Sequence, residues 1–498
     1  MEEINIQQTE RNQYRSSFGA TVLFSGVQVY QILIRLIKSK FMALFIGPSG
    51  FGIYSLLRST TDTISGITNL GLNASSVKTI ASANRDNSRD IVSRTIAAQR
   101  RLIWLTGFIG MLICAVFSPI WSQVSFGNGA YIGSFIIVST NILIDQLNRG
   151  ELALMQGLQQ RKKLAKANII GQTLNAIFTI PLYYFYGVKA IVASLVLGSV
   201  IALSISLYFS RKLKIERVKL TWGETFTIGR EMIKLGFFLS LQFILSMIVI
   251  YIIRNYVSRI GGLDQVGLYS AGTAIISNYI GLVFSAMATD YFPRLAATKS
   301  NEEMSQAVRA QAEITILLLA PLAVAFVVFI RPAITLLYSE EFLPIEKMMY
   351  WAVGGVLVQA MAWAMSYTLL AKAKPSYFFL NELVASAWGL PIKLLFYKFW
   401  GLTGFGMATV LGYSIYFVQV LIVTKKLFGI TYETSILKLF CILNLPILVG
   451  AFFKLTLPVA WGYIGGGLVL LVTGVVALYK LNQKLDLRPL IESKINIQ

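Results

Sequence analysis

Four arginines lie inside long apolar runs of this sequence, where a charged side chain is costly. They are Arg35, Arg58, Arg149 and Arg254. A charge at the centre of a bilayer costs about 2.5–3.5 kcal/mol on insertion scales, so such residues normally face water, a partner or a ligand. A guanidinium group stays charged and binds phosphate through two parallel hydrogen bonds. We therefore predict that these arginines form a site for an anion such as a diphosphate.

Each arginine also has a purely structural interpretation. Asp62 lies one helical turn from Arg58, and Asp145 lies one turn from Arg149, so each pair can neutralise itself. Arg35 and Arg254 lie near the ends of their runs, where a long side chain can extend to the interface.

Acidic residues of the same runs are candidates for binding a coupling proton or sodium ion. They are Asp62, Asp145 and Asp290. The sequence does not select among them, nor between the two ions.

Polar residues recur at helical spacing beside these charges. Residues three or four apart share one helix face. The candidates for a water-accessible cavity that solvates sugars are Gln28, Gln31, Asn69, Asn141 and Asn278, together with Trp363 and Tyr367, whose flat faces suit sugar rings. The two aromatic residues are equally compatible with ordinary packing at a membrane interface.

The elements that must position these residues are membrane-spanning helices. The chain has 498 residues, of which 55% are hydrophobic and 13% are charged, against about a quarter charged in soluble domains. Lipid leaves backbone groups unsatisfied unless the segment is helical. We predict an all-α polytopic membrane protein with fourteen spans: 18–37, 50–72, 102–122, 131–156, 167–186, 188–209, 235–257, 266–291, 311–330, 348–371, 376–397, 402–424, 436–456 and 459–480.

The net charge of +21 is unevenly distributed along the chain. With both termini in the cytoplasm, 31 of the 44 Lys and Arg fall in cytoplasmic segments, as the positive-inside rule requires. This basicity therefore indicates topology and predicts no nucleic-acid partner. The polar N-terminus has no signal-peptide cleavage pattern. We predict a multi-pass membrane protein with both termini in the cytoplasm.

The chemistry of an enzyme is not indicated. The chain has no histidine, and its two cysteines lie in apolar runs, so the commonest general base and metal ligand is absent. We expect no metal and no cofactor other than a coupling H⁺ or Na⁺, and we expect a protein that is not an enzyme.

The chain contains an internal repeat. Gly52-Ile53-Tyr54-Ser55 returns as Gly267-Leu268-Tyr269-Ser270, and YGVKAIVASLVLG from Tyr186 returns as WGLTGFGMATVLG from Trp400. Two parallel repeats are a common transporter plan. We predict two parallel six-helix bundles, with an N-terminal lobe at 1–215, a C-terminal lobe at 216–430, and two appended helices with a cytoplasmic tail at 431–498.

Several short motifs resemble a known family. GPSGFGIYSLLRS, NLGLNASSVK, VGLYSAG, YFPRLAA, LLYSEEF and LLAKAKPSYFFLNE resemble the Wzx-type flippases of lipid-linked oligosaccharides, such as O-antigen or lipid III. These flippases belong to the multidrug/oligosaccharidyl-lipid/polysaccharide (MOP) exporter superfamily, which includes the MATE transporters. The resemblance implies two six-helix lobes around a central cavity and an undecaprenyl-diphosphate-linked glycan as substrate. It places Arg35 and Arg58 at the pyrophosphate.

We therefore expect a flippase that carries this glycan from the cytoplasmic to the periplasmic leaflet by alternating access. Its expected partners are the polyprenyl-diphosphate-linked glycan, the lipid bilayer and proteins of polysaccharide polymerisation and assembly. Two alternatives stay open: a cation-coupled multidrug antiporter of the same superfamily, and a membrane glycan polymerase or ligase. The extra pair at 436–480 resembles the pair that lipid II flippases use to hold a lipid tail.

Overall fold

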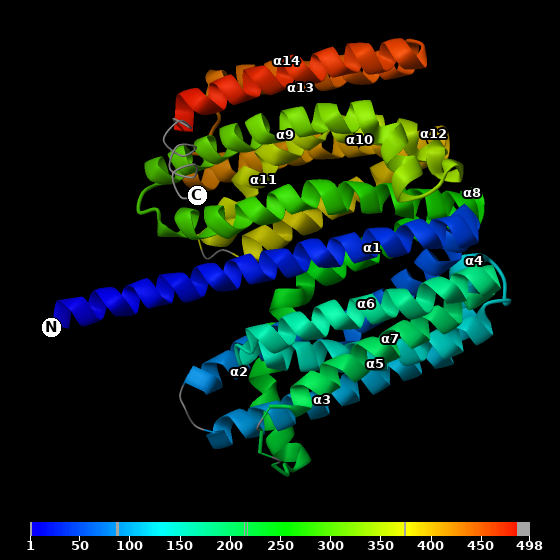
Figure 1. Cartoon of the computed structure of the whole chain (residues 1–498), viewed down its shortest axis with the longest axis vertical. Coiled ribbons are helices and arrows are strands. Elements are labelled where there is room, and N and C mark those ends of the chain that lie inside the picture. The colour runs from blue at the N-terminus through cyan, green and yellow to red at the C-terminus, as the bar shows by residue number, and fades with distance from the viewer. Residues whose placement is uncertain (1, 86–88, 214, 217, 373–374, 486–498) are drawn as a thin grey trace. The chain divides into compact units, whose positions relative to one another are not determined.

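The computed structural model describes residues 2–85, 89–213, 215–216, 218–372 and 375–485, with only the backbone given for some residues inside helices. In these ranges the chain is helical and contains no strand (Figure 1). The predicted all-α membrane fold is confirmed, because long apolar helices follow one another along the chain.

Seven stretches of the described residues are long and apolar enough to cross a membrane, or eight if the bent pair Glu340–Gly354 and Val356–Ala371 counts as one span. Two of the seven, Arg161–Arg211 and Ser376–Phe428, each contain two of the fourteen expected runs, and Ser240–Asn278 overlaps parts of two more, 235–257 and 266–291. The expected runs at 18–37, 50–72 and 131–156 lie outside these seven stretches, although the chain is helical over 18–37, 50–68 and 132–156.

The first compact unit of the chain comprises residues Met1–Gly267. Its helices are α1 (Glu2–Thr68), α2 (Leu72–Arg85), α3 (Arg89–Val116), α4 (Ser118–Phe126), α5 (Ile132–Gly157), α6 (Arg161–Tyr186), α7 (Ala190–Arg211) and the first part of α8 (Trp222–Ala297), with a short 3₁₀ turn, η1 (Gly187–Lys189). α5 packs against α3 and α7, and α6 packs against α7 and α1. These contacts place the polar faces of α1, α5 and α6 next to one another.

The second compact unit comprises Leu268–Gln498. It contains the rest of α8, then α9 (Asn301–Leu337), η2 (Glu340–Ile345), α10 (Glu346–Gly354), α11 (Val356–Ala371), α12 (Pro375–Phe428), α13 (Thr434–Thr456) and α14 (Val459–Leu485). α13 and α14 pack against each other and against α9. The structure thus divides within α8 at 267, whereas the lobes predicted from the sequence meet at 215, in the linker before this helix.

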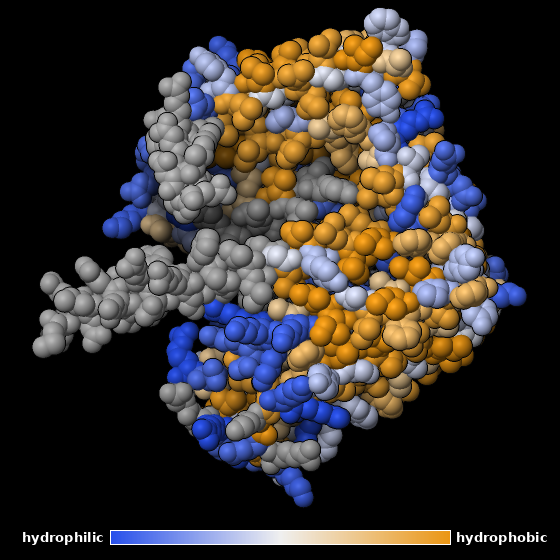
Figure 2. Space-filling model, in the orientation of Figure 1, coloured by the Kyte–Doolittle hydropathy of each residue, from blue (hydrophilic) through white to orange (hydrophobic). Residues whose placement is uncertain are grey.

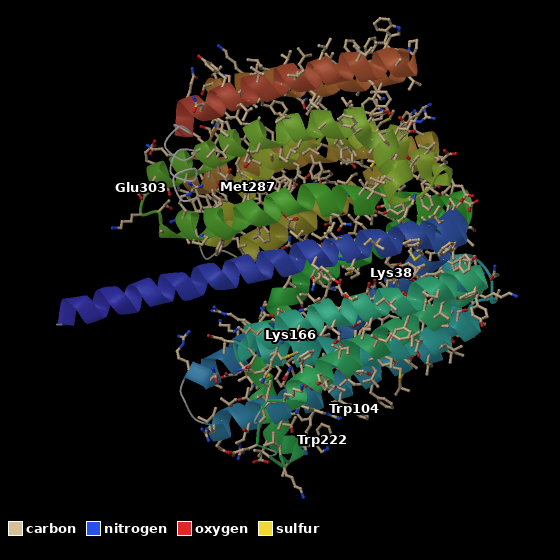
Figure 3. All side chains as sticks on the ribbon, in the orientation of Figure 1. Lys38, Trp104, Lys166, Trp222, Met287 and Glu303 are labelled. Carbon is tan, nitrogen blue, oxygen red and sulfur yellow. The ribbon has the colours of Figure 1, made fainter. Side chains whose placement is uncertain are left out.

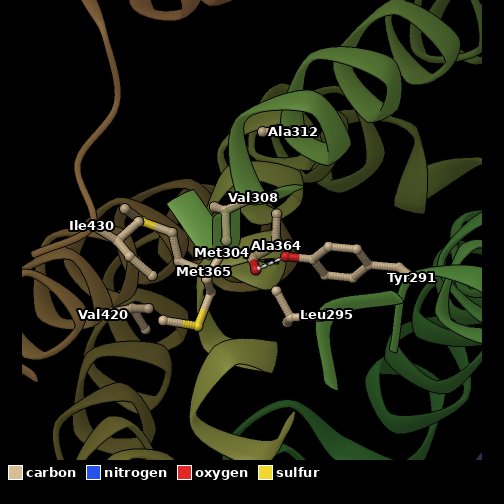
Figure 4. Close-up of a cluster of buried hydrophobic side chains, with 9 residues drawn as sticks. All are labelled: Tyr291, Leu295, Met304, Val308, Ala312, Ala364, Met365, Val420 and Ile430. Atoms are coloured by element: carbon tan, nitrogen blue, oxygen red, sulfur yellow. Dashed lines mark hydrogen bonds between the residues drawn. The ribbon is translucent and has the colours of Figure 1, made fainter. Parts of the chain in front are cut away.

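A cluster of buried apolar side chains forms part of the core of the second unit (Figure 4). The hydroxyl of Tyr291 donates a 2.6 Å hydrogen bond to the carbonyl oxygen of Ala364. Trp363, Tyr367 and Tyr416 pack against the edge of this cluster. The buried phenol therefore joins α8 to α11 while its hydroxyl stays satisfied.

The long helices bend at glycines with positive φ. α1 breaks at Gly47 (φ 61°, ψ −173°), directly before Pro48. Only glycine adopts this backbone conformation at little cost, and a residue that precedes proline avoids the α region. The break is confined to this single residue, because the helix resumes at once.

The same breaks recur in the second repeat. α8 bends at Gly262 with φ 78° and ψ −176°, 215 residues after Gly47. Gly187 has φ 53° and ψ −132°, and Gly401 in α12 has φ 56° and ψ −141°. Two pairs of glycines at nearly one offset thus share a rare backbone geometry, which gives the internal repeat a structural signature.

Two repeat-related glycines also meet in space. A Cβ atom added at Gly52 would lie 2.1 Å from the carbonyl oxygen of Leu263, and one added at Gly267 would lie 1.9 Å from the carbonyl oxygen of Pro48. Both positions must lack a side chain, since the backbones of α1 and α8 touch there.

The surface of the first unit agrees with a position in a membrane. On the face shown in Figure 2, hydrophilic side chains gather around α2, while apolar side chains cover the middle of the neighbouring helices. Exposed apolar residues of these helices include Trp104, Ile137, Phe178 and Phe185. A soluble monomer rarely exposes apolar patches of this extent.

Candidate functional site

Arg58 lies at the centre of a charged cluster in the first unit. It belongs to the part of α1 that follows the break at Gly47, and its side chain is 29% exposed. Its Nε donates to Asp62 Oδ2 at 3.0 Å, and its Nη1 donates to Asp145 Oδ2 of α5 at 2.9 Å. The two carboxylates thereby stabilise a guanidinium that is only partly exposed to solvent.

Arg149 joins this cluster through a longer contact. Its Nη2 lies 3.8 Å from Asp62 Oδ1, and its side chain is 42% exposed. The expected pairing of Arg58 with Asp62 is confirmed, but Asp145 pairs with Arg58 on the other helix rather than with Arg149. Arg149 is therefore the guanidinium of the cluster with the most donors available to a ligand.

A cavity of about 310 Å³ opens beside this cluster. It is formed by α1, α5, α6 and α7, and its lining residues are Arg58, Asp145, Asn148, Arg149, Leu152, Ala167, Asn168, Gly171, Gln172, Asn175 and Ala202. The lining is charged on one side and rich in amides on another. Gln172 Oε1 is buried with no hydrogen-bond partner in the described part of the chain, so a hydrogen-bonding ligand or water would satisfy it.

A lysine one residue beyond the predicted span 18–37 also contacts the helices that form the cavity. Lys38, which is labelled on α1 in Figure 3, donates a 2.6 Å hydrogen bond to Asn175 Oδ1 of α6. Asn175 itself lines the cavity. The sequence signal for this side was present, because Asn168, Gln172 and Asn175 follow one another at helical spacing. Lys38 was missed because it lies just past the end of an apolar run.

The other two predicted arginines do not line the cavity. Arg35 is exposed, and its Nε donates to the backbone oxygen of Gln31, one turn earlier on α1. Arg254 of α8 is half-buried, and its Nη1 donates to the backbone oxygen of Ser55 at 3.3 Å. Their assignment to a diphosphate remains a prediction.

Asn69 belongs to a polar contact between helices rather than to the cavity lining. Its Nδ2 donates to Gln146 Oε1 of α5 at 3.5 Å, and Gln146 Nε2 donates in turn to Thr68 Oγ1 of α1 at 3.1 Å. Thr106 of α3 donates to the same Gln146 oxygen. Gln146, which the sequence analysis did not single out, thus joins three helices.

Asn141 of α5 is a buried polar residue. It is 1% exposed, and neither of its amide atoms has a hydrogen-bond partner among the residues that the structure describes. A buried amide without partners is costly unless water or a ligand reaches it.

The remaining predicted residues are dispersed. Gln28 is exposed and Gln31 is half-buried on α1, whereas Asn278 is half-buried on α8. The rings of Trp363 and Tyr367 lie 4.4 Å apart, in contact with Tyr291. The side chain of Asp290 lies outside the described residues.

The arrangement suits the binding of a polyvalent anion that carries hydroxyl groups. Three cations, Arg58, Arg149 and Lys38, are opposed by two carboxylates, Asp62 and Asp145, in this part of α1 and α5. Guanidinium groups bind phosphate oxygens in a two-pronged geometry. The amides of α6 can donate to and accept from hydroxyl groups. No group of three or more Cys, Asp or Glu that could hold a metal ion occurs among the described residues.

Comparisons with known proteins agree with this architecture. The chain is 25% identical over 321 residues to a Shigella flexneri protein named "Putative O-antigen transporter", a match that covers 62% of this chain and 74% of that protein.

Two solved structures share the fold. A lipid II flippase, MurJ, in an inward closed conformation matches with a TM-score of 0.71 at 14% identity, over 93% of this chain and 99% of that one. An inward-facing multidrug resistance MATE transporter of the MOP superfamily matches with a TM-score of 0.68 at 15% identity, over 84% of this chain and 99% of that one. At these identities the likeness concerns the fold alone.

A family model described as "Polysaccharide biosynthesis protein" matches residues 19–299. This region is more than half of the chain and contains the motifs GPSGFGIYSLLRS and VGLYSAG. The resemblance that these motifs indicate is confirmed, and the chain belongs to the polysaccharide biosynthesis protein family.

Proposed function

We propose that this protein is a flippase that moves an undecaprenyl-diphosphate-linked oligosaccharide, an O-antigen unit or a related surface-glycan unit, from the cytoplasmic to the periplasmic leaflet. The observation that carries the proposal is the cavity beside Arg58 and Arg149, where guanidinium groups of α1 and α5 lie beside a row of amides on α6. The family match and the name of the Shigella relative support a glycan-related substrate.

In this proposal Arg149 and Arg58 bind the diphosphate and the amides of α6 solvate the first sugars, while the polyprenyl tail stays in lipid. Arg58 already binds two carboxylates. The ligand must therefore compete with Asp62 and Asp145, which weakens binding enough for release on the far side. Either carboxylate could also take a coupling H⁺ or Na⁺, but each would have to leave Arg58 to do so.

The proposal further places the protein in a bacterial inner membrane with both termini in the cytoplasm, together with proteins of polysaccharide polymerisation and assembly. Its action is alternating access and not bond chemistry. A MATE-like multidrug antiporter is the second candidate, because the MATE structures share the fold. A basic cavity disfavours cationic drugs.

The direct test is complementation of a strain that lacks the gene. Arg58→Ala and Arg149→Ala are expected to abolish surface glycan and to cause lipid-linked intermediate to accumulate, since the anion loses its guanidinium partners. The matched control is Arg230→Ala, at an exposed position near the start of α8. Membrane levels of each variant show whether it is made.

The outcomes separate the candidates. Normal surface glycan and normal intermediate in both cavity variants would overturn the anion site. Tight binding of a cationic dye by the purified protein would favour the antiporter. Elongation of lipid-linked glycan in detergent, where there is no membrane to cross, would favour a polymerase or ligase.

A further inference from the structure

A second polar centre lies in α12, far along the chain from Arg58. Glu382 is a partly buried carboxyl group seven residues after the helix begins at Pro375. No lysine or arginine of the described chain forms an ion pair with it. A carboxylate inside a membrane span is costly when no cation pairs with it. Other groups must therefore stabilise Glu382.

Hydrogen bonds, rather than a cation, satisfy this carboxyl group. Trp388 Nε1 donates to Gln419 Oε1 at 2.8 Å, and Gln419 Nε2 donates to Asn381 Oδ1 at 2.8 Å. Asn381 Nδ2 donates to Tyr416 Oη at 3.4 Å, and the Tyr416 hydroxyl donates to Glu382 Oε1. Each of these four hydrogen bonds is directed toward Glu382. Such a chain stabilises the ionised carboxylate, because each bond polarises the next.

This series of hydrogen bonds also joins the two arms of α12. Asn381, Glu382 and Trp388 precede the break at Gly401, whereas Tyr416 and Gln419 follow it. Gln419 Nε2 binds the backbone oxygen of Asn381 as well, at 2.8 Å. The ionisation state of one carboxyl group is thus linked to the contact between two membrane-spanning segments.

Few other titratable groups face Glu382. On the second arm of α12 they are Tyr413 and Tyr416. α11, which packs on α12, contains no charged residue from Val356 to Ala371. α10 carries Glu346 and Lys347 at its first turn, where Met348 packs on Gly406. Gly406 is ten residues before Tyr416, about 15 Å along the helix.

We propose that Glu382 is a proton-binding site whose protonation loosens the contact between the two arms of α12. The proton forms an O–H bond on the carboxyl group, and the Tyr416 hydroxyl loses its anionic acceptor and turns to accept from the new donor. On deprotonation the proton leaves to water, and the original chain re-forms. The role of this proton as the coupling ion rests on the proposed transport function, but the binding itself does not.

Infrared spectroscopy of the purified full chain in lipid bilayers tests the binding without any substrate. On acidification a protonated-carboxyl C=O band is expected, and this band should be missing in Glu382→Gln. Glu341→Gln, at an exposed position of η2, is the control and should keep the band. Tyr416→Phe removes one donor to the carboxylate, so the transition should move to higher pH, with proton binding about tenfold tighter.

Folding of the variants is checked independently. Glu382→Asp keeps a carboxyl group and should keep the band at a shifted pH, even if Tyr416→Phe does not fold. The same band in Glu382→Gln would overturn the proposal, as would the lack of any titrating band assigned to this residue. Loss of the band on addition of NaCl at constant pH would also overturn it, because the site would then take sodium.

Transport in proteoliposomes tests the coupling separately, with a fluorescent undecaprenyl-diphosphate-linked sugar as the probe. Glu382→Gln should move the probe at a rate that no longer depends on a pH gradient. If the wild-type chain binds the proton in the infrared assay but moves no probe, the proposed function fails while the proton site stands. If transport in Glu382→Gln still follows the gradient, the coupling role fails.

Discussion

Lys38 and Arg35 lie three residues apart on α1, yet their side chains have different surroundings. Lys38 donates to Asn175 of the cavity wall, whereas Arg35 is exposed and binds only the backbone oxygen of Gln31 in the described structure. Residue type alone favoured the arginine, since guanidinium binds phosphate better. Position relative to α6 decides which cation contacts the cavity wall, and a single sequence does not contain that information.

We therefore expect Lys38→Met to reduce transport of a lipid-linked diphosphate by about tenfold or more, because a charge-assisted hydrogen bond is worth about 1.5–3 kcal/mol. Arg35→Met is the matched variant and should have a smaller effect. The measurement is the transport rate in proteoliposomes at equal protein content. A larger loss in Arg35→Met would restore Arg35 as the cation of this span.

Of the two ion pairs that Arg58 forms in the described part of the chain, the sequence indicates only one. Asp62 follows Arg58 by one turn, so its pairing was predictable from helix geometry. The bond from Arg58 to Asp145 connects residues 87 positions apart. Such a contact depends on how α1 packs against α5, and periodicity within one helix says nothing about it.

A third residue, Glu224, makes the start of α8 sensitive to pH. It accepts hydrogen bonds from the backbone N–H of Thr221 at 2.7 Å and from the Thr221 hydroxyl at 2.9 Å, and it pairs with Arg94 at 2.6 Å. The two bonds from Thr221 are the larger cause of its lowered pKa, and Arg94 adds to it. This is a capping box that lies before the membrane-spanning part of α8.

Because the folded state lowers the pKa of Glu224, its carboxylate stabilises the cap at a pH above the unfolded pKa. That contribution disappears as the pH falls through the folded pKa. Hydrogen exchange of the first-turn amides of α8, corrected for intrinsic rates, should therefore become faster on acidification. In Glu224→Gln the exchange should already be fast at neutral pH and change little. Equal protection in both proteins at neutral pH would contradict this account.

At the scale of the elements, glycines determine where the long helices bend. The sequence contains these glycines, with Gly47 directly before Pro48 and with Gly187 and Gly401 at matching places of a repeated motif, but its hydrophobic runs suggested separate spans with loops between them. In the structure α1, α8 and α12 continue through these points with one non-helical residue each. The sequence does not indicate this continuity, because a hydrophobic run ends at the membrane interface whether or not the helix ends there.

The contact of α13 and α14 with α9 allows a matched test. A Cβ added at Gly466 of α14 would lie 2.7 Å from Val328 Cγ2 of α9, whereas one at Gly467 would meet no atom within 4 Å. Gly466→Leu should lower the apparent melting temperature in detergent, since overpacking costs about 1–3 kcal/mol. Gly467→Leu gains the same helix propensity without the clash. Equal melting temperatures would show that α14 does not dock on α9 in this way.

At the scale of the whole molecule, the class of protein was the most predictable feature. Hydropathy and charge asymmetry require only that apolar helices cross lipid and that basic loops stay in the cytoplasm. The parallel repeat was visible because its glycines recur at nearly one offset, and the φ and ψ angles at these glycines now agree as well. Glu382 escaped notice because its partner Tyr416, and Gln419 that binds the adjacent Asn381, lie more than thirty residues away.

The predicted topology can be checked by labelling single cysteines. In a background of Cys114→Ser and Cys441→Ser, we place Ser82→Cys in α2 and Ala130→Cys between α4 and α5, both at exposed positions. A membrane-impermeant maleimide added from the periplasmic side should label Ala130→Cys. It should reach Ser82→Cys only after the inner membrane is opened. The reverse pattern would invert the assignment of both termini to the cytoplasm.

The meeting of Gly52 with Gly267 also bears on how the two halves of such a gene can diverge. The space that a side chain would need is occupied by main chain that cannot rotate away, the carbonyl group of Leu263 for Gly52 and that of Pro48 for Gly267. A substitution of either glycine, even by alanine, therefore cannot be compensated by a side-chain change in the other repeat. Both positions therefore had to remain glycine while the rest of the two repeats diverged.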